Sequence, residues 1–167
     1  EAEKFFKDAF RISERSGNSY GMGINQRQLG NIALQTGDFD NAEDIFRKQI
    51  EIEETFGSGL GYRIALGYLV DVLVEKLKGR RGEKNQVQIE EVQKKLTEYV
   101  EKCTDEDDKI GIAWSKFRNG KLELAIGNIK EGETLIREAM LYCEKLGRED
   151  YRKIFGSYLN NSEHKPS

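Results

Sequence analysis

The feature that most constrains this chain is a pattern of apolar residues that recurs about every 40 positions. The segment that begins at Ala2 overlays the segment that begins at Ala42, and Phe6 then corresponds to Phe46. Within each copy the apolar residues stand three and four positions apart, which is the spacing of an amphipathic helix. Such self-similarity predicts an array of helical repeats in which each unit buries its apolar stripe against its neighbours.

The same pattern returns farther along the chain. The segment from Ile89 carries it 47 positions after Ala42, because residues 79–85 form an insertion, and the segment from Gly132 carries it 90 positions after Ala42. A last segment, 151–159, repeats the helix that comes first in each pair. The chain therefore contains three helical pairs flanked by a single helix on each side.

These segments predict an all-α fold, with a repeat domain over residues 1–159 and a disordered polar tail over 160–167. Because the chain starts and ends within a repeat, we expect it to be a fragment of a longer array. Eight helices are expected, at 2–16, 19–36, 39–56, 60–78, 86–103, 107–126, 129–146 and 149–160.

One helix-turn-helix stretch carries the pattern in most detail. Leu29-Gly30 and Ala33 stand in its first helix, where Leu29, Ile32 and Ala33 are expected to share one inward face, and Ala42 and Phe46 stand four residues apart in its second. This order resembles the tetratricopeptide repeat, here in a long form of about 40 residues, whereas the basic unit has about 34. The resemblance implies an α-α superhelix of three and a half to four helical hairpins, a solenoid whose concave groove binds a segment of another protein.

The resemblance also implies which residues line that groove, since the first helix of each pair faces the concave side in such arrays. The corresponding positions are Arg27, Asn31 and Gln35 in the first pair, Gly67, Asp71 and Glu75 in the second, and Phe117 and Lys121 in the third. Asn31 is suited to pair with the main chain of a bound peptide, and Arg27 and Lys121 are suited to hold carboxylates. Asp71 and Glu75 favour a basic stretch.

Two alternatives stay open for these positions. The polar members can be ordinary solvated residues of a groove whose partner binds elsewhere. Phe117, with the neighbouring Trp114, can instead pack in the core.

Composition narrows the classes of partner. A net charge of -3 spread over both signs gives no general attraction to nucleic acid or to anionic membranes. The longest apolar run, from Leu69 to Val74, is far too short to cross a bilayer and is interrupted by Asp71. Cys103 and Cys143 stand at apolar positions of predicted helices, which favours buried thiols over a disulfide and indicates a reducing, cytoplasmic setting. The expected partner is a protein or peptide.

No motif points to catalysis, a metal or a cofactor. The only histidine, His164, lies in the polar tail, so the folded body has no histidine for a general base or a multi-histidine metal site. The glycine-rich loop 57–61 lacks the lysine of a phosphate-binding loop and follows a helix, where that mechanism requires a strand. The acidic run 105–108 lacks the spacing of a calcium loop and suits a helix N-terminus.

The sequence thus predicts a non-enzymatic scaffold that binds a peptide segment of its partner in a preformed groove. The alternative is a sensor or autoinhibitory segment of a larger signalling or transcription-regulatory protein. The basic residues of 78–84 leave two interpretations open, a solvated loop or a docking point for an acidic partner.

Overall fold

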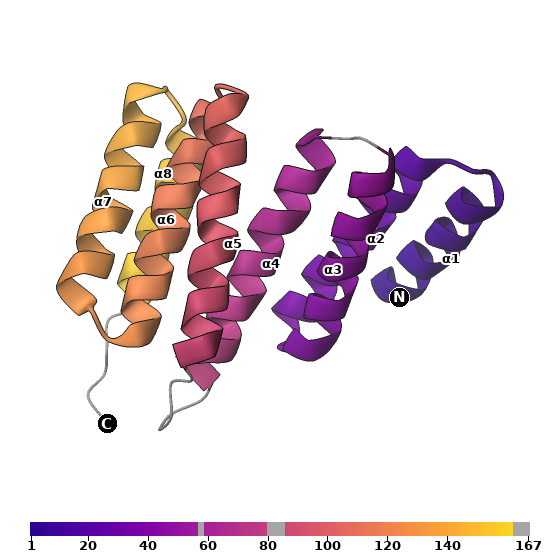
Figure 1. Ribbon diagram of the computed structural model, residues 1–167, viewed down its shortest axis with the longest axis horizontal. Coiled ribbons are helices and arrows are strands. Elements are labelled where there is room, and N and C mark those ends of the chain that lie inside the picture. Colours follow the sequence, from indigo (N-terminus) through magenta and orange to yellow (C-terminus); the bar gives the residue numbers. More distant parts are fainter. Residues whose placement is uncertain (57–58, 80–85, 162–167) are drawn as a thin grey trace. The chain divides into compact units, whose positions relative to one another are not determined.

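The computed structural model describes residues 1–56, 59–79 and 86–161, and these residues contain eight α-helices and no strand (Figure 1). The helices are α1 (Ala2–Arg15), α2 (Ser19–Gln35), α3 (Phe39–Phe56), α4 (Gly59–Gly79), α5 (Gln86–Asp105), α6 (Lys109–Ile126), α7 (Ile129–Lys145) and α8 (Glu149–Asn161). The predicted all-α helical repeat is confirmed, and each helix begins and ends within two residues of its expected bounds.

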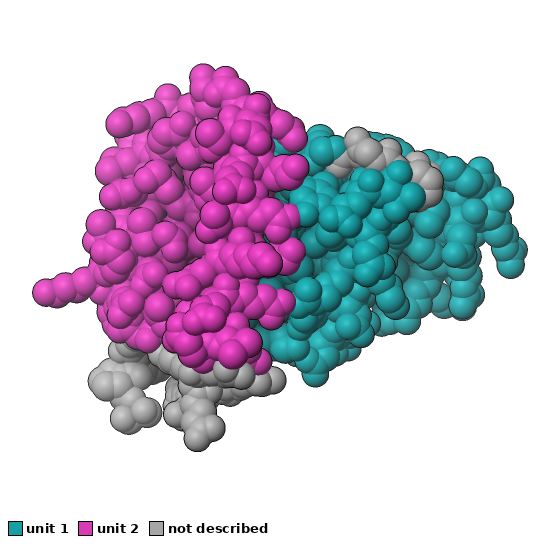
Figure 2. Space-filling model, in the orientation of Figure 1, with its two compact units in different colours: residues 1–76 teal, residues 77–167 magenta. Residues whose placement is uncertain are grey.

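The chain divides into two compact units, residues 1–76 and 77–167 (Figure 2). The first unit holds α1, α2, α3 and most of α4, and the second holds the end of α4 and α5 to α8. The predicted repeat domain spans both units. The predicted tail starts inside α8, and its residues 162–167 lie outside the described part of the chain, as do residues 80–85 of the predicted insertion.

One turn geometry joins most successive helices. After α1, Gly17 adopts a left-handed conformation with a φ of +64°, and the amide of Asn18 donates a hydrogen bond of 2.9 Å to the carbonyl of Ser13. This is a Schellman motif, which ends a helix by satisfying its last carbonyls. The corresponding bond closes the turns after α2, α5, α6 and α7, with donors Asp38, Asp108, Asn128 and Arg148.

The residue that closes a turn often caps the next helix as well. The side chain of Asn18 accepts a hydrogen bond from the amide of Gly21 at 2.9 Å, and Asp108 accepts one from the amide of Gly111 at 2.8 Å. Because one residue ends a helix and helps to start the next, these connections are very short. Short connections place successive helices side by side in antiparallel directions, so each pair forms a helical hairpin.

The core of the first unit is built around Phe46 of α3, which is fully buried. Its ring lies against Gly30 of α2, where an added Cβ would come within 2.5 Å of the ring, and it stacks on Tyr68 of α4 at a centroid distance of 5.1 Å. Ala33 is buried as expected, whereas Leu29, expected on the same inward face, is only partly buried. The glycine therefore allows α2 and α3 to approach closely around one aromatic ring.

The core of the second unit is an aromatic cluster between α6 and α8. Phe117 stacks on Phe155 at 4.3 Å, and Trp114 meets Phe155 edge-on at 4.9 Å. Beside the cluster, Cys143 of α7 is fully buried, and Cys103 of α5 is also fully buried. The described residues contain no disulfide between these two cysteines.

A cluster of ion pairs joins α3 to α4 in the first unit. The ammonium of Lys76 donates hydrogen bonds to Asp40 at 2.6 Å and to Glu43 at 2.7 Å, and Arg47 also donates to Glu43 at 2.8 Å. Burial alone would raise the pKa of Glu43, but the hydrogen bonds from Lys76 and Arg47 outweigh it and hold that pKa below its ordinary value of 4.5. The charged form of Glu43 therefore stabilises this contact.

Glu43→Gln is expected to lower the free energy of unfolding by about 1 kcal/mol near neutral pH. A carboxylate whose pKa is lowered by folding contributes stability above its unfolded pKa, and that contribution is lost as the pH falls through the folded pKa. The difference between Glu43→Gln and the unmodified chain should therefore shrink below pH 4.5. Urea unfolding at about pH 7 and about pH 3 measures this, with the exposed Glu54→Gln as control. An equal difference at both pH values would contradict the assignment.

Candidate functional site

The eight residues predicted to face a groove divide between the two units. Arg27, Asn31 and Gln35 lie on α2 and Gly67, Asp71 and Glu75 on α4, all in the first unit, while Phe117 and Lys121 lie on α6 in the second. Within each helix they stand four residues apart, so each set shares one helical face. Their exposure differs from helix to helix.

The α2 residues are the most accessible of these sets. Arg27 and Asn31 are partly buried and Gln35 is exposed, whereas Gly67 and Asp71 of α4 are buried and Glu75 is partly buried. The face of α2 therefore offers polar groups that a partner can reach, and the corresponding face of α4 offers few.

The two α6 residues belong to the packing of the second unit. Phe117 lies in the aromatic cluster, which is the alternative that the sequence left open for it. Lys121 is also buried, with its ammonium 5.5 Å from the centroid of the Tyr158 ring and 5.9 Å from that of Phe117. At these distances the ammonium lies within range of a cation–π contact with both rings.

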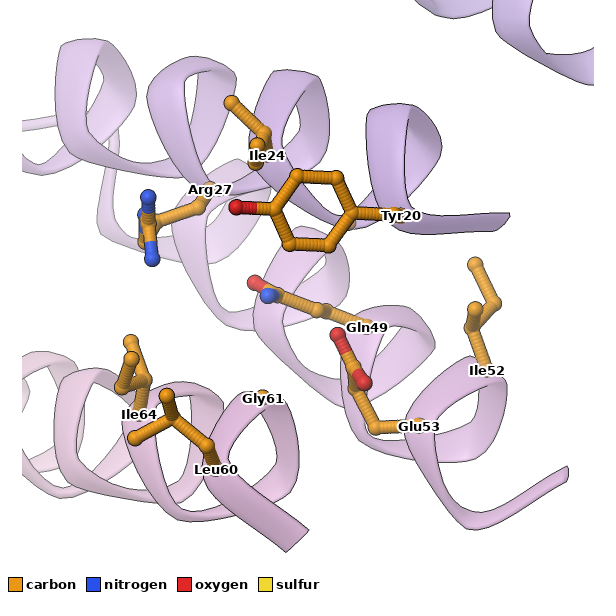
Figure 3. Close-up of a pocket in the computed structure, with 10 residues that line it drawn as sticks. Tyr20, Ile24, Arg27, Gln49, Ile52, Glu53, Leu60, Gly61 and Ile64 are labelled. Atoms are coloured by element: carbon orange, nitrogen blue, oxygen red, sulfur yellow. The ribbon is translucent and has the colours of Figure 1, made fainter. Parts of the chain in front are cut away.

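A cleft of about 180 Å³ opens in the first unit where α2, α3 and α4 meet (Figure 3). Arg27 is the predicted groove residue that lines it. The other lining residues are Tyr20, Gly23 and Ile24 of α2, Gln49, Ile52 and Glu53 of α3, and Leu60, Gly61 and Ile64 of α4. In Figure 3 the hydroxyl of Tyr20 is turned toward Arg27, and the ends of Gln49 and Glu53 approach the same space from α3.

Gln49 is the most unusual of these residues. Its side chain is only 2% exposed, and its Oε1 atom is buried without a hydrogen-bond partner among the described residues. A buried amide oxygen left in this way destabilises a fold by about 1 to 3 kcal/mol. If the amide turns that oxygen toward the cleft, a donor group on a bound molecule removes the penalty.

Glu53 lies one helical turn after Gln49, in a slot made by two glycines. An added Cβ at Gly23 of α2 would come within 2.7 Å of a Glu53 carboxylate oxygen, and an added Cβ at Gly61 of α4 would overlap the same carboxylate. The carboxylate therefore reaches the cleft because both neighbouring helices lack a side chain there. From the sequence, Gly61 was predicted only as part of a turn, and neither Glu53 nor Gln49 was predicted to be a site residue.

The equivalent place in the second unit is filled. Ninety positions after Arg27, Gln49, Glu53 and Gly61, the chain has Phe117, Ala139, Cys143 and Tyr151, all of which belong to the second core or pack on it. The first two helices of each copy have nearly the same lengths, 17 and 18 residues for α2 and α3 and 18 and 17 for α6 and α7, and the turn between them closes with the same hydrogen bond. The repeat itself therefore does not require a cleft, which results from the polar and glycine residues of the first unit.

A wider depression of about 630 Å³ lies in the second unit among α5, α6 and α7. It is lined partly by apolar side chains such as Leu96 and Leu135, and its one lysine, Lys116, is already paired with Glu138 at 2.8 Å. This depression lacks the buried, unsatisfied amide that distinguishes the cleft of the first unit.

The described residues contain no group of three or more His, Cys, Asp or Glu side chains placed to hold a metal ion. No described helix combines the length and the apolar composition needed to cross a membrane. Comparison with models of protein families and with curated proteins gave no match for this chain. The resemblance to the tetratricopeptide repeat therefore stays a prediction from the sequence.

Proposed function

We propose that the chain is a non-enzymatic interaction module that holds a peptide segment of a partner protein on the first unit. The observation that carries the proposal is the position of Arg27, whose side chain lines the cleft and forms no hydrogen bond or ion pair with a described residue. Asn31 and Gln35 continue the same face of α2 one and two turns farther on. This row of polar groups suits the main chain and carboxylates of a bound segment.

Apolar side chains at the edge of the cleft support the same conclusion. Tyr20 is 79% exposed and Leu60 is 58% exposed, and both line the cleft. Covering them would remove apolar surface from water, which favours binding by about 25 cal/mol for each Å² buried. Because the helices already hold these groups in place, most of the ordering on binding falls on the partner segment.

The proposal includes no catalytic step and sets the protein in the cytoplasm. The polar side chains of the cleft are those of an arginine, a glutamine, a glutamate and a tyrosine, and no hydrogen bond joins any two of them in a nucleophile and base pair. Two buried cysteines without a disulfide in the described residues support a reducing compartment.

Selection from a displayed library of random peptides tests the proposal. We expect the full chain to enrich peptides that share a motif containing a carboxylate, and Arg27→Ala and Asn31→Ala each to weaken their binding by about tenfold, which is about 1.4 kcal/mol. Neither change should lower the unfolding midpoint much, because neither side chain is part of the buried core. Lys48→Ala, an exposed lysine of α3, serves as control. Failure to enrich any motif, or peptides that bind both variants as well as the unmodified chain, would overturn the proposal.

A further inference from the structure

We propose that the cleft of the first unit is a site for a small zwitterion with the size and charge pattern of a free α-amino acid. The inference goes beyond the binding of a partner segment, because such a ligand would bind the chain without any partner protein. It rests on the charges, the buried amide, the size of the cleft and the contrast between the two copies of the repeat.

The cleft contains one cation and one anion that do not neutralise each other. Arg27 enters from α2 and Glu53 from α3, and neither side chain forms an ion pair or hydrogen bond with a described residue. A guanidinium binds a carboxylate through two parallel hydrogen bonds, and a carboxylate binds an ammonium group. A ligand with both charges would satisfy both residues, whereas a ligand with one charge would leave the other residue unsatisfied beside it.

Gln49 gives the ammonium end a second acceptor. Its Oε1 atom is buried and has no partner in the part of the chain that the structure describes, and Gln49 stands one helical turn before Glu53 on the same face of α3. An ammonium group has three N–H donors, so once the Gln49 amide turns to present Oε1 to the cleft, the ammonium can donate to that oxygen and to the carboxylate of Glu53 together. The hydroxyl of Tyr20, which is turned toward Arg27, lies on the side where the ligand carboxylate would bind (Figure 3).

The size of the cleft limits the ligand to a small molecule. Its volume of about 180 Å³ is below the range of about 300 to 1,000 Å³ that is typical of sites for drug-sized ligands. The remaining walls are aliphatic, formed by Ile24, Ile52, Leu60 and Ile64. These walls suit a short carbon chain between or beside the two charges.

The contrast with the second unit argues against a purely structural role for these polar groups. At the equivalent positions the second unit has Phe117, Ala139 and Cys143, which are buried and pack together. The first unit instead buries an amide without a partner and leaves two opposite charges apart. A bound zwitterion would account for all three differences at once.

Thermal unfolding and titration calorimetry of the full chain test the inference with each of the common L-amino acids at about 10 mM. At least one amino acid is expected to raise the unfolding midpoint and to give a saturable heat of binding. Single-charge analogues should bind at least about tenfold more weakly. For leucine these analogues are 4-methylpentanoate, which lacks the amine, and 3-methylbutylamine, which lacks the carboxylate.

Variants locate the site. Arg27→Met and Glu53→Gln are each expected to weaken binding by about tenfold or more, whereas the exposed Arg15→Met and Glu54→Gln should not change it. Gln49→Ala introduces the residue type that the second unit has at the equivalent position, Ala139, so this variant should stay folded and bind more weakly. It tests the site even if Glu53→Gln unfolds the chain. The inference is overturned if no amino acid binds, if a single-charge analogue binds as tightly, or if Arg27→Met and Gln49→Ala leave the affinity unchanged. The peptide selection described above has its own outcome, so the failure of one proposal does not imply failure of the other.

Discussion

Phe46→Ala is expected to lower the free energy of unfolding by about 3 to 5 kcal/mol. The Phe46 ring is fully buried, fills the space that Gly30 leaves on α2, and stacks on Tyr68 of α4. Removing the ring leaves a cavity at the place where three helices of the first unit meet, and the short turns limit how far those helices can move to close it.

Urea unfolding followed by circular dichroism measures this loss. Phe5→Ala, which removes an exposed ring from α1, is the matched control and should change the free energy of unfolding by less than about 0.5 kcal/mol. Leu29→Ala should fall between the two, because Leu29 is only partly buried. A loss for Phe46→Ala no larger than that for Phe5→Ala would show that this ring does not hold α2, α3 and α4 together.

Phe155→Ala should have an effect of similar size on the second unit, about 3 to 5 kcal/mol. The Phe155 ring is fully buried and contacts both Phe117 and Trp114 of α6, so it connects α8 to the rest of the unit. Aromatic pairs of this kind add about 0.5 to 1.5 kcal/mol to the effect of area burial alone.

The chain contains a single tryptophan, and it lies in this cluster, so its fluorescence reports directly on the second unit. In Phe155→Ala we expect the emission of Trp114 to shift to longer wavelength at a lower urea concentration than in the unmodified chain. Ile154→Ala, which changes the exposed neighbouring residue, is the control. Identical midpoints for the two variants would contradict the assignment of Phe155 to the core.

Most of the fold could be predicted because local rules determine it. Glycine or an Asx residue stands at each short turn, as at Gly37 and Asp38, and the apolar stripe between turns has the period of a helix. Gly30 and Phe46 were predicted to stand in successive helices, and their direct contact is a finding of the structure. Leu29 was placed too deep, since the glycine beside it, and not the leucine, faces the ring of Phe46.

The candidate site was predicted only in part. Register within the repeat identified Arg27, but it assigned the same role to Phe117, which is buried because α8 brings Phe155 against it. Gln49 and Glu53 were missed because they stand on the helical face that normally carries apolar residues. Aligning the two copies ninety positions apart identifies Gln49 and Glu53 as unusual polar residues, because their counterparts are Ala139 and Cys143.

Backbone amide shifts measured by NMR on the isotope-labelled full chain test most directly whether the cleft of the first unit is the binding surface. On titration with a selected peptide, or with the amino acid that binds most tightly, the largest shifts are predicted at Gly23 and Gly61, which flank the Glu53 carboxylate. The amides of Ala113 and Tyr151, their counterparts in the second unit, should not move. Shifts that are largest at Ala113 and Tyr151, or that leave Gly23 and Gly61 unchanged at saturation, would contradict this account.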